Sequence, residues 1–507
     1  MTESETVLYE TESLCPECLT VIPAKIVRTP DDRVEIVKEC PEHGEFRDVV
    51  WSDYRFYERA FEYEFQGPGI ENPNTDVARG CPLDCGLCPQ HESCTALGII
   101  DVTNRCNMNC PVCFANAEAK GYVYEPTLEQ IEEMLDRLRS ERPLPCRAVQ
   151  FAGGEPLVRE DIHEIIAMAA EKGFHVQIAT NAIEFARNPD LAKDLHDAGL
   201  RVVYMQFDGL DREIYREIRG SAKVLDLKLE AIEALEKEGV STVLVPTLAK
   251  GVNDDQIGPM LELAREYHVI RGINVQPISF TGRVPLEERR RMRITIPDFV
   301  KLVEEQTDGK VPADSFYPVP IAAKIARLVN TLQGSNKPEF SAHPLCGVAT
   351  YLIEENDGYV PITEFVDPDA FIEFLEQLVE KVGRIESRRD KLRAAKMLMK
   401  FITKNMRKLF KITMGKKLAK LMVDVVTKGT YDAISEFHWN SLLLGCMHFM
   451  DPYNFQTDRV RRCVIHYATP DGRIIPFCAY NSVHRQEVEE KFSVPLEVWK
   501  KRRAAAE

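Results

Sequence analysis

The stretch Cys106-Asn107-Met108-Asn109-Cys110-Pro111-Val112-Cys113 decides how this 507-residue chain is interpreted. Three thiolates separated by three and by two residues can hold three irons of a [4Fe–4S] cluster and leave the fourth iron without a protein ligand. An iron with an open position can bind a substrate or cofactor, whereas a cluster with four protein ligands is usually restricted to electron transfer or structure. The motif therefore predicts a catalytic iron–sulfur site, with a zinc knuckle as the alternative.

The segments on both sides of this motif indicate where it lies in the fold. Residues 97–103 (Leu-Gly-Ile-Ile-Asp-Val-Thr) indicate a buried strand, so the cysteines directly follow a strand. The next predicted strand, 147–151, leads into the turn Gly153-Gly154-Glu155-Pro156. The cysteine triad, the aromatic Phe114 behind it and this Gly-Gly-Glu-Pro turn together resemble the radical S-adenosylmethionine (SAM) enzymes.

Strands and helices alternate over residues 98–278. The candidate strands are 98–103, 147–151, 175–180, 201–207, 240–247 and 271–277, and segments with helical periodicity include 128–139, 161–172, 225–238 and 256–267. This alternation predicts an α/β fold with a parallel sheet, either open and doubly wound or a partial barrel. The resemblance implies the second, a TIM-like partial (β/α)6 barrel with the cluster at the C-terminal mouth of the strands.

The resemblance also implies how SAM is bound. The open iron chelates the amino and carboxylate groups of SAM, and reduction releases a 5′-deoxyadenosyl radical that abstracts hydrogen from an unactivated C–H bond. The Gly-Gly-Glu-Pro turn is expected at the SAM amino group, and later strand ends at the ribose, carboxylate and adenine. The expected contacts are Phe114, Gly153, Gly154, Glu155, Pro156, Asn181, Gln206, Asp208 and Gln276. Ordinary turn and cap chemistry is the alternative for the polar residues at strand ends.

Composition indicates a globular protein rich in metal ligands. Hydrophobic residues make up 44% of the chain and charged residues 28%, which is ordinary for a soluble protein. The start Met-Thr-Glu-Ser-Glu-Thr has no basic or apolar region of a secretory signal, and no run of about 18 apolar residues predicts a transmembrane helix. In a reducing cytoplasm the fifteen cysteines therefore indicate metal ligands rather than disulfides.

A second cysteine group lies just ahead of the first barrel strand. Its members, in the pattern C-x3-C-x2-C-x5-C, are Cys81, Cys85, Cys88 and Cys94. The first three imitate the spacing of the triad and compete for its role. However, no strand leads into Cys81, and a fourth cysteine closes the set. The group predicts an auxiliary [4Fe–4S] cluster, with zinc as the alternative.

A third group is scattered through the C-terminal region and comprises Cys346, Cys446, Cys463 and Cys478. Local context is more informative than spacing: Cys463 precedes a hairpin signal at Asp471-Gly472-Arg473 and then Pro476-Phe477-Cys478, and Cys346 precedes Asp357-Gly358-Tyr359. This order resembles the auxiliary-cluster domains appended to radical SAM enzymes and implies another [4Fe–4S] cluster. Buried structural cysteines are the alternative.

The N-terminal region has the layout of a metal ribbon. Its candidate ligands, two on each side of a short strand-like stretch, are Cys15, Cys18, Cys40 and His43. Three cysteines and a histidine favour tetrahedral zinc. A mononuclear iron is the competitor, particularly if another thiolate replaces His43, and Cys146 is the only unassigned cysteine.

A strongly basic segment interrupts this acidic chain, whose net charge is −16. Residues 384–420 contain 14 Lys and Arg against the two acids Glu386 and Asp390. An apolar stripe accompanies the charges and consists of Leu392, Leu398, Met399, Phe401, Ile402, Met406, Leu409 and Phe410. This pattern predicts an amphipathic helix at an anionic membrane surface. A solvated helix packed on the protein core is the alternative, and no nucleic-acid partner is expected because no aromatic platform is interleaved with the charges.

The metal groups divide the chain into five predicted parts. They are an N-terminal metal ribbon (1–60), an auxiliary-cluster segment (61–97), the barrel (98–300), a connector (301–345) and a C-terminal α+β auxiliary-cluster domain (346–507) with the basic insertion at about 370–445. The order of these groups resembles the archaeal tetraether lipid synthase family (GDGT/macrocyclic archaeol synthases) over nearly the full length.

This second resemblance implies a reaction and its partners. The enzyme would join terminal methyl carbons of isoprenoid chains of archaeal diether phospholipids by sp3–sp3 coupling, with an auxiliary cluster holding the first alkyl intermediate. The implied cofactors are SAM, three [4Fe–4S] clusters and one mononuclear zinc or iron ion. The implied setting is cytoplasmic, at the membrane periphery, with an electron donor such as ferredoxin or flavodoxin. Relatives with this layout have also been labelled pterin-dependent methyltransferases, so a pterin-type methyltransferase or a peptide-modifying radical SAM enzyme is the alternative.

Overall fold

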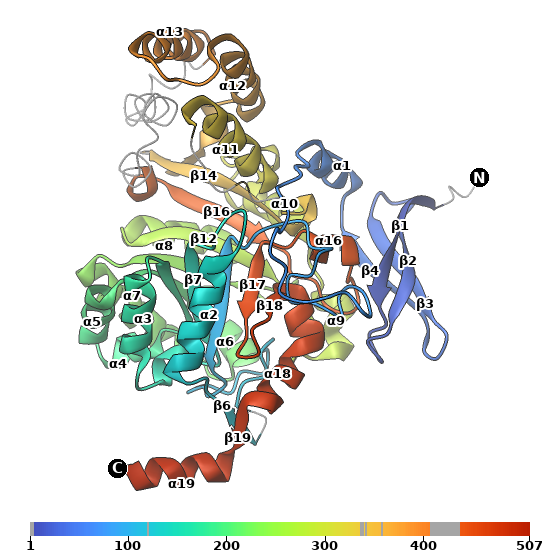
Figure 1. The fold of residues 1–507 in the computed structure, drawn as a ribbon, viewed down its shortest axis with the longest axis vertical. Helices are drawn as coiled ribbons and strands as arrows, with labels where there is room; N and C mark the ends of the chain where they lie inside the picture. Colours follow the sequence, from blue (N-terminus) through green and yellow to red (C-terminus); the bar gives the residue numbers. More distant parts are fainter. Residues whose placement is uncertain are drawn as a thin grey trace.

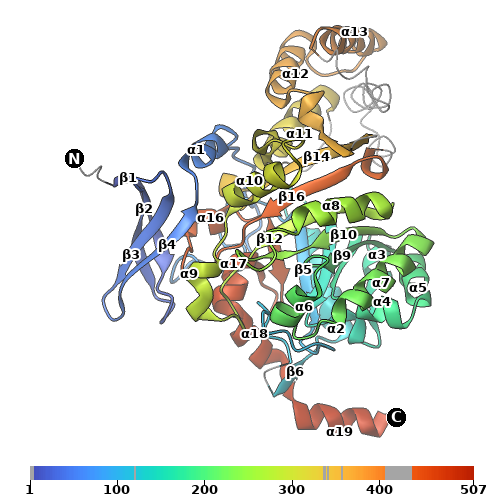
Figure 2. The same cartoon turned by 180° about the vertical axis from the view of Figure 1, so that it is seen from behind.

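The computed structural model describes residues 5–118, 121–334, 339, 342–355, 358–405 and 437–506 (Figure 1). A large mixed sheet forms the centre of the molecule, a four-stranded antiparallel sheet lies at the N-terminal end, and β6 (Tyr122–Tyr124) pairs with β19 (Ser493–Pro495). The four-stranded sheet stands to one side of the central sheet in both views (Figures 1 and 2).

Six consecutive parallel strands make up the middle of the central sheet. They are β5 (Leu97–Thr103), β7 (Ala148–Gly153), β8 (His175–Thr180), β9 (Leu200–Gln206), β10 (Ser241–Val245) and β12 (Ile270–Pro277). Each pairs in parallel with the next in this order, and short β11 (Thr247–Leu248) pairs with β12. The predicted α/β fold with a partial barrel is confirmed, and all six predicted strands are present.

The connecting helices cover the outer face of these strands (Figure 2). They are α2 (Leu128–Ser140), α3 (Ile162–Glu171), α4 (Ile183–Arg187), α5 (Asp190–Ala198), α6 (Arg212–Arg219), α7 (Val224–Glu238) and α8 (Ile257–Glu266). Helix α2 shows why these segments form helices that pack on the sheet. Thr127 and Gln130 form a capping box at its start, and Ile131, Leu135 and Leu138 lie on one buried face at helical spacing. At the end of α7, Gly239 adopts the left-handed conformation (φ 66°) that stops a helix.

The C-terminal part of the chain extends the same sheet at both edges. Beyond β12 lie β16 (Leu442–Met447), β14 (Gly347–Glu355), β13 (Tyr317–Pro318) and β15 (Gly358–Pro361), and beyond β5 lie β17 (Ile465–Ala468) and β18 (Ile474–Pro476). Strands β16 and β17 run parallel to their barrel neighbours. The C-terminal region therefore completes the walls around the strand ends, while the predicted domain boundaries stay predictions.

The short C-terminal helices follow these strands. They are α16 (Thr457–Arg461), α17 (Phe477–Ala479), α18 (Arg485–Phe492) and α19 (Leu496–Ala506). At the other end of the chain, the ribbon consists of β1 (Thr6–Leu14), β2 (Val21–Arg28), β3 (Val34–Cys40) and β4 (Gly44–Trp51), followed by α1 (Tyr54–Glu62). Ser13 on β1 donates to Phe455 O at 2.6 Å, which joins the ribbon to the segment before α16.

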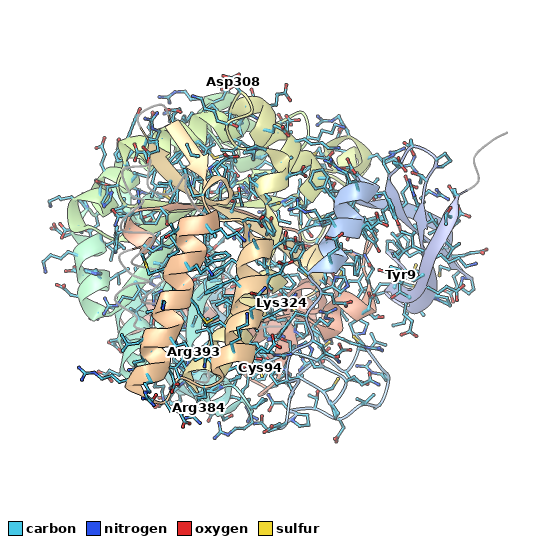
Figure 3. The ribbon with its side chains drawn as sticks, turned by 90° about the horizontal axis from the view of Figure 1, so that it is seen from above. Tyr9, Cys94, Asp308, Lys324, Arg384 and Arg393 are labelled. Carbon is cyan, nitrogen blue, oxygen red and sulfur yellow. The ribbon has the colours of Figure 1, made fainter. Side chains whose placement is uncertain are left out.

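The remaining helices include the start of the basic segment. They are α9 (Arg289–Met292), α10 (Ile296–Gln306), α11 (Pro320–Gln333), α12 (Pro368–Val382) and α13 (Arg388–Asn405), with Arg384 and Arg393 labelled in Figure 3.

The basic segment is packed on the protein along part of its predicted apolar stripe. Leu398 and Ile402 of α13 are buried against Leu375 of α12, whereas Leu392 and Met399 are 70% and 46% exposed. Met406, Leu409 and Phe410 lie outside the described residues. No described helix is long and apolar enough to cross a membrane.

Candidate active site and metal centres

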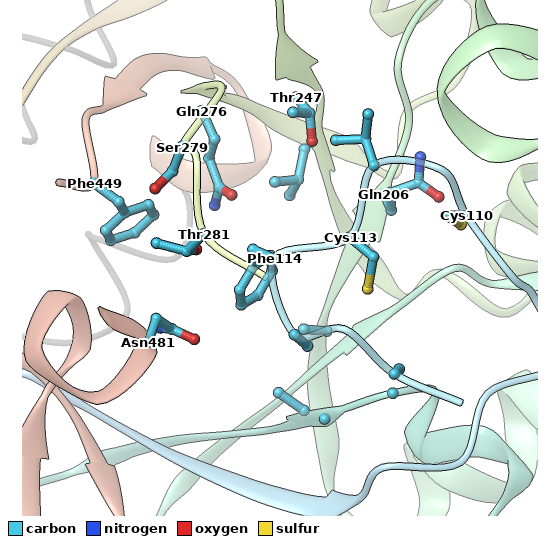
Figure 4. Close-up of a pocket in the computed structure, with 18 of the residues that line it drawn as sticks. Cys110, Cys113, Phe114, Gln206, Thr247, Gln276, Ser279, Thr281, Phe449 and Asn481 are labelled. Carbon is cyan, nitrogen blue, oxygen red and sulfur yellow. The ribbon is translucent and has the colours of Figure 1, made fainter. Parts of the chain in front are cut away.

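A pocket of about 230 Å³ opens at the carboxyl ends of the barrel strands. The three cysteines of the decisive motif, Cys106, Cys110 and Cys113, all line it. They lie on the loop after β5, and the pocket continues to C-terminal residues such as Phe449 and Asn481 (Figure 4). Three thiols converging on one cavity, with space beside them, fit a cluster that keeps one iron open to a cofactor.

The structure places most of the predicted SAM contacts on this pocket. Its lining includes Phe114, Gly153, Gly154, Asn181, Gln206 and Gln276. The other three predicted contacts, Glu155, Pro156 and Asp208, are not among the residues that line the pocket. The Glu155 carboxylate accepts hydrogen bonds from Thr180 Oγ1 and Asn181 N, both at 2.7 Å. Burial raises the pKa of Glu155 to about 7.

The glycines of the Gly-Gly-Glu-Pro turn are required by packing against the cysteine loop. A Cβ atom on Gly153 would lie 2.0 Å from Thr103 O, and one on Gly154 would lie 2.2 Å from Arg105 O. Gly153 also has φ +127°, which disfavours other residues. The glycines therefore bring two protein segments together beside the pocket, which both of them line.

A buried ion pair anchors the cysteine loop. Arg219, at the end of α6, forms two hydrogen bonds of 2.8 Å to the carboxylate of Asp208, which is fully buried. The same guanidinium donates to Val112 O at 2.9 Å and to Thr247 Oγ1 at 3.0 Å. Asp208, predicted as a SAM contact, thus orients Arg219, and Arg219 holds the loop between the second and third cysteines.

Two more basic residues that sequence analysis did not single out complete this support. Arg283 donates from Nε to Cys110 O at 2.7 Å. Lys228 of α7 is fully buried, and its Nζ donates to Asn181 O at 2.8 Å and to Gln206 O at 2.5 Å. Burial lowers the pKa of Lys228 to about 8. Helical periodicity in 225–238 places Lys228 on an apolar stripe, and this was the available signal.

The wall opposite the cysteines is largely apolar and aromatic. Phe449 stacks on Phe477 with ring centroids 3.9 Å apart, and the ring of Phe114, which directly follows Cys113 and is 41% exposed, lies 6.0 Å from that of Phe477. Amide and hydroxyl side chains interrupt this wall, among them those of Gln276, Ser279, Thr281 and Asn481 (Figure 4). The pocket can therefore present flat apolar faces together with a few hydrogen-bonding groups.

The N-terminal ribbon brings its four predicted ligands together. The ligand atoms of Cys15, Cys18, Cys40 and His43 all lie within 4.8 Å of one another. His43 Nδ1 is 3.6 Å from Cys15 Sγ and 3.5 Å from Cys40 Sγ, and Cys18 Sγ is 4.0 Å from Cys40 Sγ. These separations suit tetrahedral coordination with bonds of about 2.0–2.3 Å. The contact with Thr20 lowers the pKa of the Cys18 thiol to about 6, which favours the ligating thiolate.

Cys146, the alternative fourth ligand, lies elsewhere. It is fully buried in the core of the barrel, and its Sγ donates to Ala148 O at 3.2 Å. His43 therefore completes the ribbon site, and its donor set fits a single metal ion.

Changing Cys40 to serine is expected to remove one metal equivalent per chain, because the remaining three ligands no longer surround the ion. Elemental analysis by mass spectrometry measures this loss and identifies zinc or iron in the wild type. Acid-labile sulfide should not change, because a mononuclear site contains none. Cys146→Ser is the matched control and should retain all metal, and an unchanged metal content in Cys40→Ser would contradict the assignment.

The second cysteine group divides in the structure. The thiol of Cys85 interacts with those of Cys81 and Cys88 and is within electrostatic reach of Cys463. Cys94, labelled in Figure 3, instead donates to Gly69 O at 3.2 Å, and its acidic neighbours are Glu141 and Glu71. Three of the four predicted ligands therefore come together, and Cys94 is directed to a different loop.

The third group divides in the same way. The thiols of Cys346, Cys463 and Cys478 lie within electrostatic reach of one another. Cys446 lies near the end of β16, opposite Val275 of β12 and Val348 of β14, and is fully buried in the barrel core. Because β16 joins the sheet, its side chains pack against barrel helices and strands rather than toward the other cysteines. Cysteine spacing contained no signal of this register.

Comparison with known proteins gives the same architecture. The radical SAM superfamily pattern matches residues 100–264, and the pattern of the HMPTM N-terminal zinc ribbon domain matches residues 7–52. The chain is 50% identical to the 7,8-dihydro-6-hydroxymethylpterin dimethyltransferase of Methanocaldococcus jannaschii, over 97% of each chain. It is 26% identical to a GTP 3′,8-cyclase of Clostridium acetobutylicum, over 51% of this chain and 85% of that protein. The solved structure of Streptococcus suis SuiB is similar over 43% of this chain and 46% of its own, with 20% identity and a TM-score of 0.35.

The name of the first relative overturns the expected resemblance to tetraether lipid synthases. Half of the aligned residues are shared with a protein named a pterin dimethyltransferase. By this comparison the lipid-coupling reaction, the phospholipid substrate and the membrane contact are wrong, and the pterin-type methyltransferase that was the alternative is favoured. With half its residues shared along nearly its whole length, the chain is a radical SAM enzyme that binds SAM and a [4Fe–4S] cluster, and it belongs to the family of this dimethyltransferase.

Proposed function

We propose that this protein is a radical SAM methyltransferase that methylates 7,8-dihydro-6-hydroxymethylpterin. The observation that carries the proposal is the 50% identity to a dimethyltransferase of that pterin over 97% of both chains. The match to the zinc ribbon named for the same family supports it further.

The residues of the pocket have distinct parts in this chemistry. The cluster and SAM, when bound, supply a 5′-deoxyadenosyl radical, and Cys106, Cys110 and Cys113 hold that cluster. Arg219 and Arg283 fix the cysteine loop through its carbonyl groups.

The opposite wall suits a flat heterocycle. The stacked rings of Phe449 and Phe477 offer an aromatic face, and such faces favour offset stacking. Gln276 and Asn481 line the same pocket and can pair with the amide-like edge of a pterin ring.

The other two cysteine groups are proposed as auxiliary iron–sulfur sites. Cys81, Cys85 and Cys88 would hold one cluster, and Cys346, Cys463 and Cys478 would hold the other. Cys94 and Cys446, part of the original ligand sets, are left out because their thiols lie in other surroundings. Three clusters and one ribbon ion are thus proposed for each chain.

Incubation of anaerobically reconstituted protein with SAM, a low-potential reductant and the reduced pterin is expected to give mono- and dimethylated pterin, because two methyl groups are transferred by the relative of that name. Mass spectrometry of the products, with methyl-labelled SAM in a parallel reaction, measures the transfer and its donor.

The control for this reaction is the Cys106→Ala protein, which should form no methylated pterin. Deoxyadenosine formation without any methylated pterin, with the clusters fully loaded, would contradict the proposal. So would the appearance of joined isoprenoid chains when a diether phospholipid is supplied in place of the pterin.

A further inference from the structure

Helix α16 lies between the two auxiliary cysteine groups and directs one arginine to each. Arg459 and Arg461 are two residues apart, so about 200° of helical rotation separates their side chains. Arg459 contacts Cys346 of one group, while in the other group Cys85 and then the positive charge of Arg461 lower the pKa of the Cys81 thiol. We propose that these arginines are positioning residues that supply the counter-charge of the two auxiliary clusters and raise their reduction potentials.

Arg459 is the more deeply buried of the two, with 1% of its surface exposed. Its Nη2 donates to His448 O at 2.9 Å and to Leu345 O at 3.3 Å, and lies 3.8 Å from Cys346 Sγ. Its Nε and Nη1 are buried without a hydrogen-bond partner among the described residues. Cys478 is also within electrostatic reach. The guanidinium therefore faces the cysteine group with donors that remain unused.

Arg461 is arranged similarly toward the other group. Its Nε is buried without a hydrogen-bond partner among the described residues, and after Cys85 its positive charge lowers the pKa of the Cys81 thiol. The backbone ties the helix to the same loop: Arg461 O accepts from Glu92 N at 2.7 Å, and Thr457 O lies 4.0 Å from Cys81 Sγ. The second group thus has a cation at one of its thiols.

Carboxylates do not balance these two charges. Within the described ranges, neither arginine has a carboxylate oxygen within 4.0 Å, although Asp458 is within electrostatic reach of Arg459. The Asp458 carboxylate is turned to Thr11 Oγ1, at 2.7 Å, and to His343 Nε2, at 3.6 Å. Arg459 is buried whereas Arg461 is half-buried, and a buried cation such as Arg459 is strongly unfavourable without an anion. Neutral thiols provide no anion, whereas thiolates bound to an iron–sulfur cluster do.

The same arrangement predicts an effect on electron transfer. A cluster gains negative charge on reduction, so a nearby fixed cation stabilises its reduced form and raises its potential; net charge and hydrogen bonds to sulfur are among the factors that set this potential. Because Cys85 is within electrostatic reach of Cys463, the two groups adjoin, and each arginine tunes one of two neighbouring centres. This inference rests on the proposed auxiliary clusters but does not depend on the substrate.

Redox titration of the full-length protein, followed by electron paramagnetic resonance, tests the inference with Arg459→Gln and Arg461→Gln. Each change should lower the midpoint potential of a different cluster signal. Signals are assigned as those lost in Cys346→Ala and in Cys81→Ala. Arg459→Lys and Arg461→Lys keep the positive charge and should retain potentials close to that of the wild type.

Iron and sulfide content are measured in parallel. A variant that loses its cluster with glutamine but keeps it with lysine supports the role of the charge, whereas loss with both residues overturns it. Unchanged potentials in fully loaded glutamine variants, or equal shifts with glutamine and lysine, also overturn it, as does a wild type that contains one cluster only. Absence of pterin methylation with all three signals present would reject the proposed function and leave this inference standing.

Discussion

Replacement of Cys106 by alanine is expected to abolish formation of 5′-deoxyadenosine from SAM. Cys106, Cys110 and Cys113 are three thiols on one pocket, and removing one leaves two protein ligands for a cluster that already has an open iron. Changes in the groups that merely orient metal ligands cost about 10–100-fold, so loss of a ligand should cost more than about 100-fold. Chromatography of deoxyadenosine after anaerobic incubation with SAM and reductant measures the effect.

Cys146→Ala is the matched control for this variant. Its thiol is fully buried and bonded to Ala148 O, away from the cysteine groups. It should lose about 1 kcal/mol of stability and retain deoxyadenosine formation. A Cys106→Ala protein with full activity would show that the triad is not the SAM site. Cys81, Cys85 and Cys88, which have the same spacing, would then be the ligands to test.

Replacement of Asp208 by alanine is expected to destabilise the protein by about 3–5 kcal/mol, because it leaves Arg219 as an unpaired buried cation. The two hydrogen bonds of 2.8 Å between these side chains would be lost, together with the bond of 3.1 Å from Thr247 N to the carboxylate. Because Arg219 also holds Val112 O, the cysteine loop should bind its cluster less completely. Denaturant unfolding and iron content measure the two effects.

An exposed ion pair gives the control for this change. Asp226 pairs with Arg212 at the surface, and Asp226→Ala should not change the unfolding midpoint measurably, because exposed pairs contribute little. Asp208 was predicted from the sequence as a contact of SAM. If contact with SAM were its main role, Asp208→Ala would weaken SAM binding without a change in stability. This outcome would contradict the role of Asp208 in anchoring the cysteine loop through Arg219.

The barrel strands were predicted because their signals are local. Each of the six segments is a short apolar run bounded by turns, and parallel strands buried on both faces have this composition. The structure places strands at Leu97–Thr103, Ala148–Gly153 and the four later segments. The ribbon ligands were equally predictable, because a Cys-x2-Cys pair and a Cys-x2-His pair lie on turns at the ends of neighbouring strands.

Other parts of the site could not be predicted because they depend on long-range pairing. Cys446 looks like its partners in sequence, yet β16 enters the sheet beside β12 and buries it in the core. Arg219 is one of many arginines in the chain, and only the fold brings it to Asp208 and Val112 O. The basic stripe has the same periodicity whether it packs on protein or on a membrane, so its partial burial on α12 was undetermined.

The sequence by itself determined the parallel strands with their helices, the cysteine triad after the first of these strands and the ribbon site, because a strand, a turn and a metal-binding spacing each involve a few neighbouring residues. Only the tertiary structure decided which distant cysteines meet, which glycines pack against Thr103 and Arg105, and which buried arginines face the thiols. These contacts join residues that are up to hundreds of positions apart, such as Arg459 and Cys346. Their formation depends on strand register and on the need to pair every buried charge, and neither can be predicted from the spacing of residues that are close in sequence.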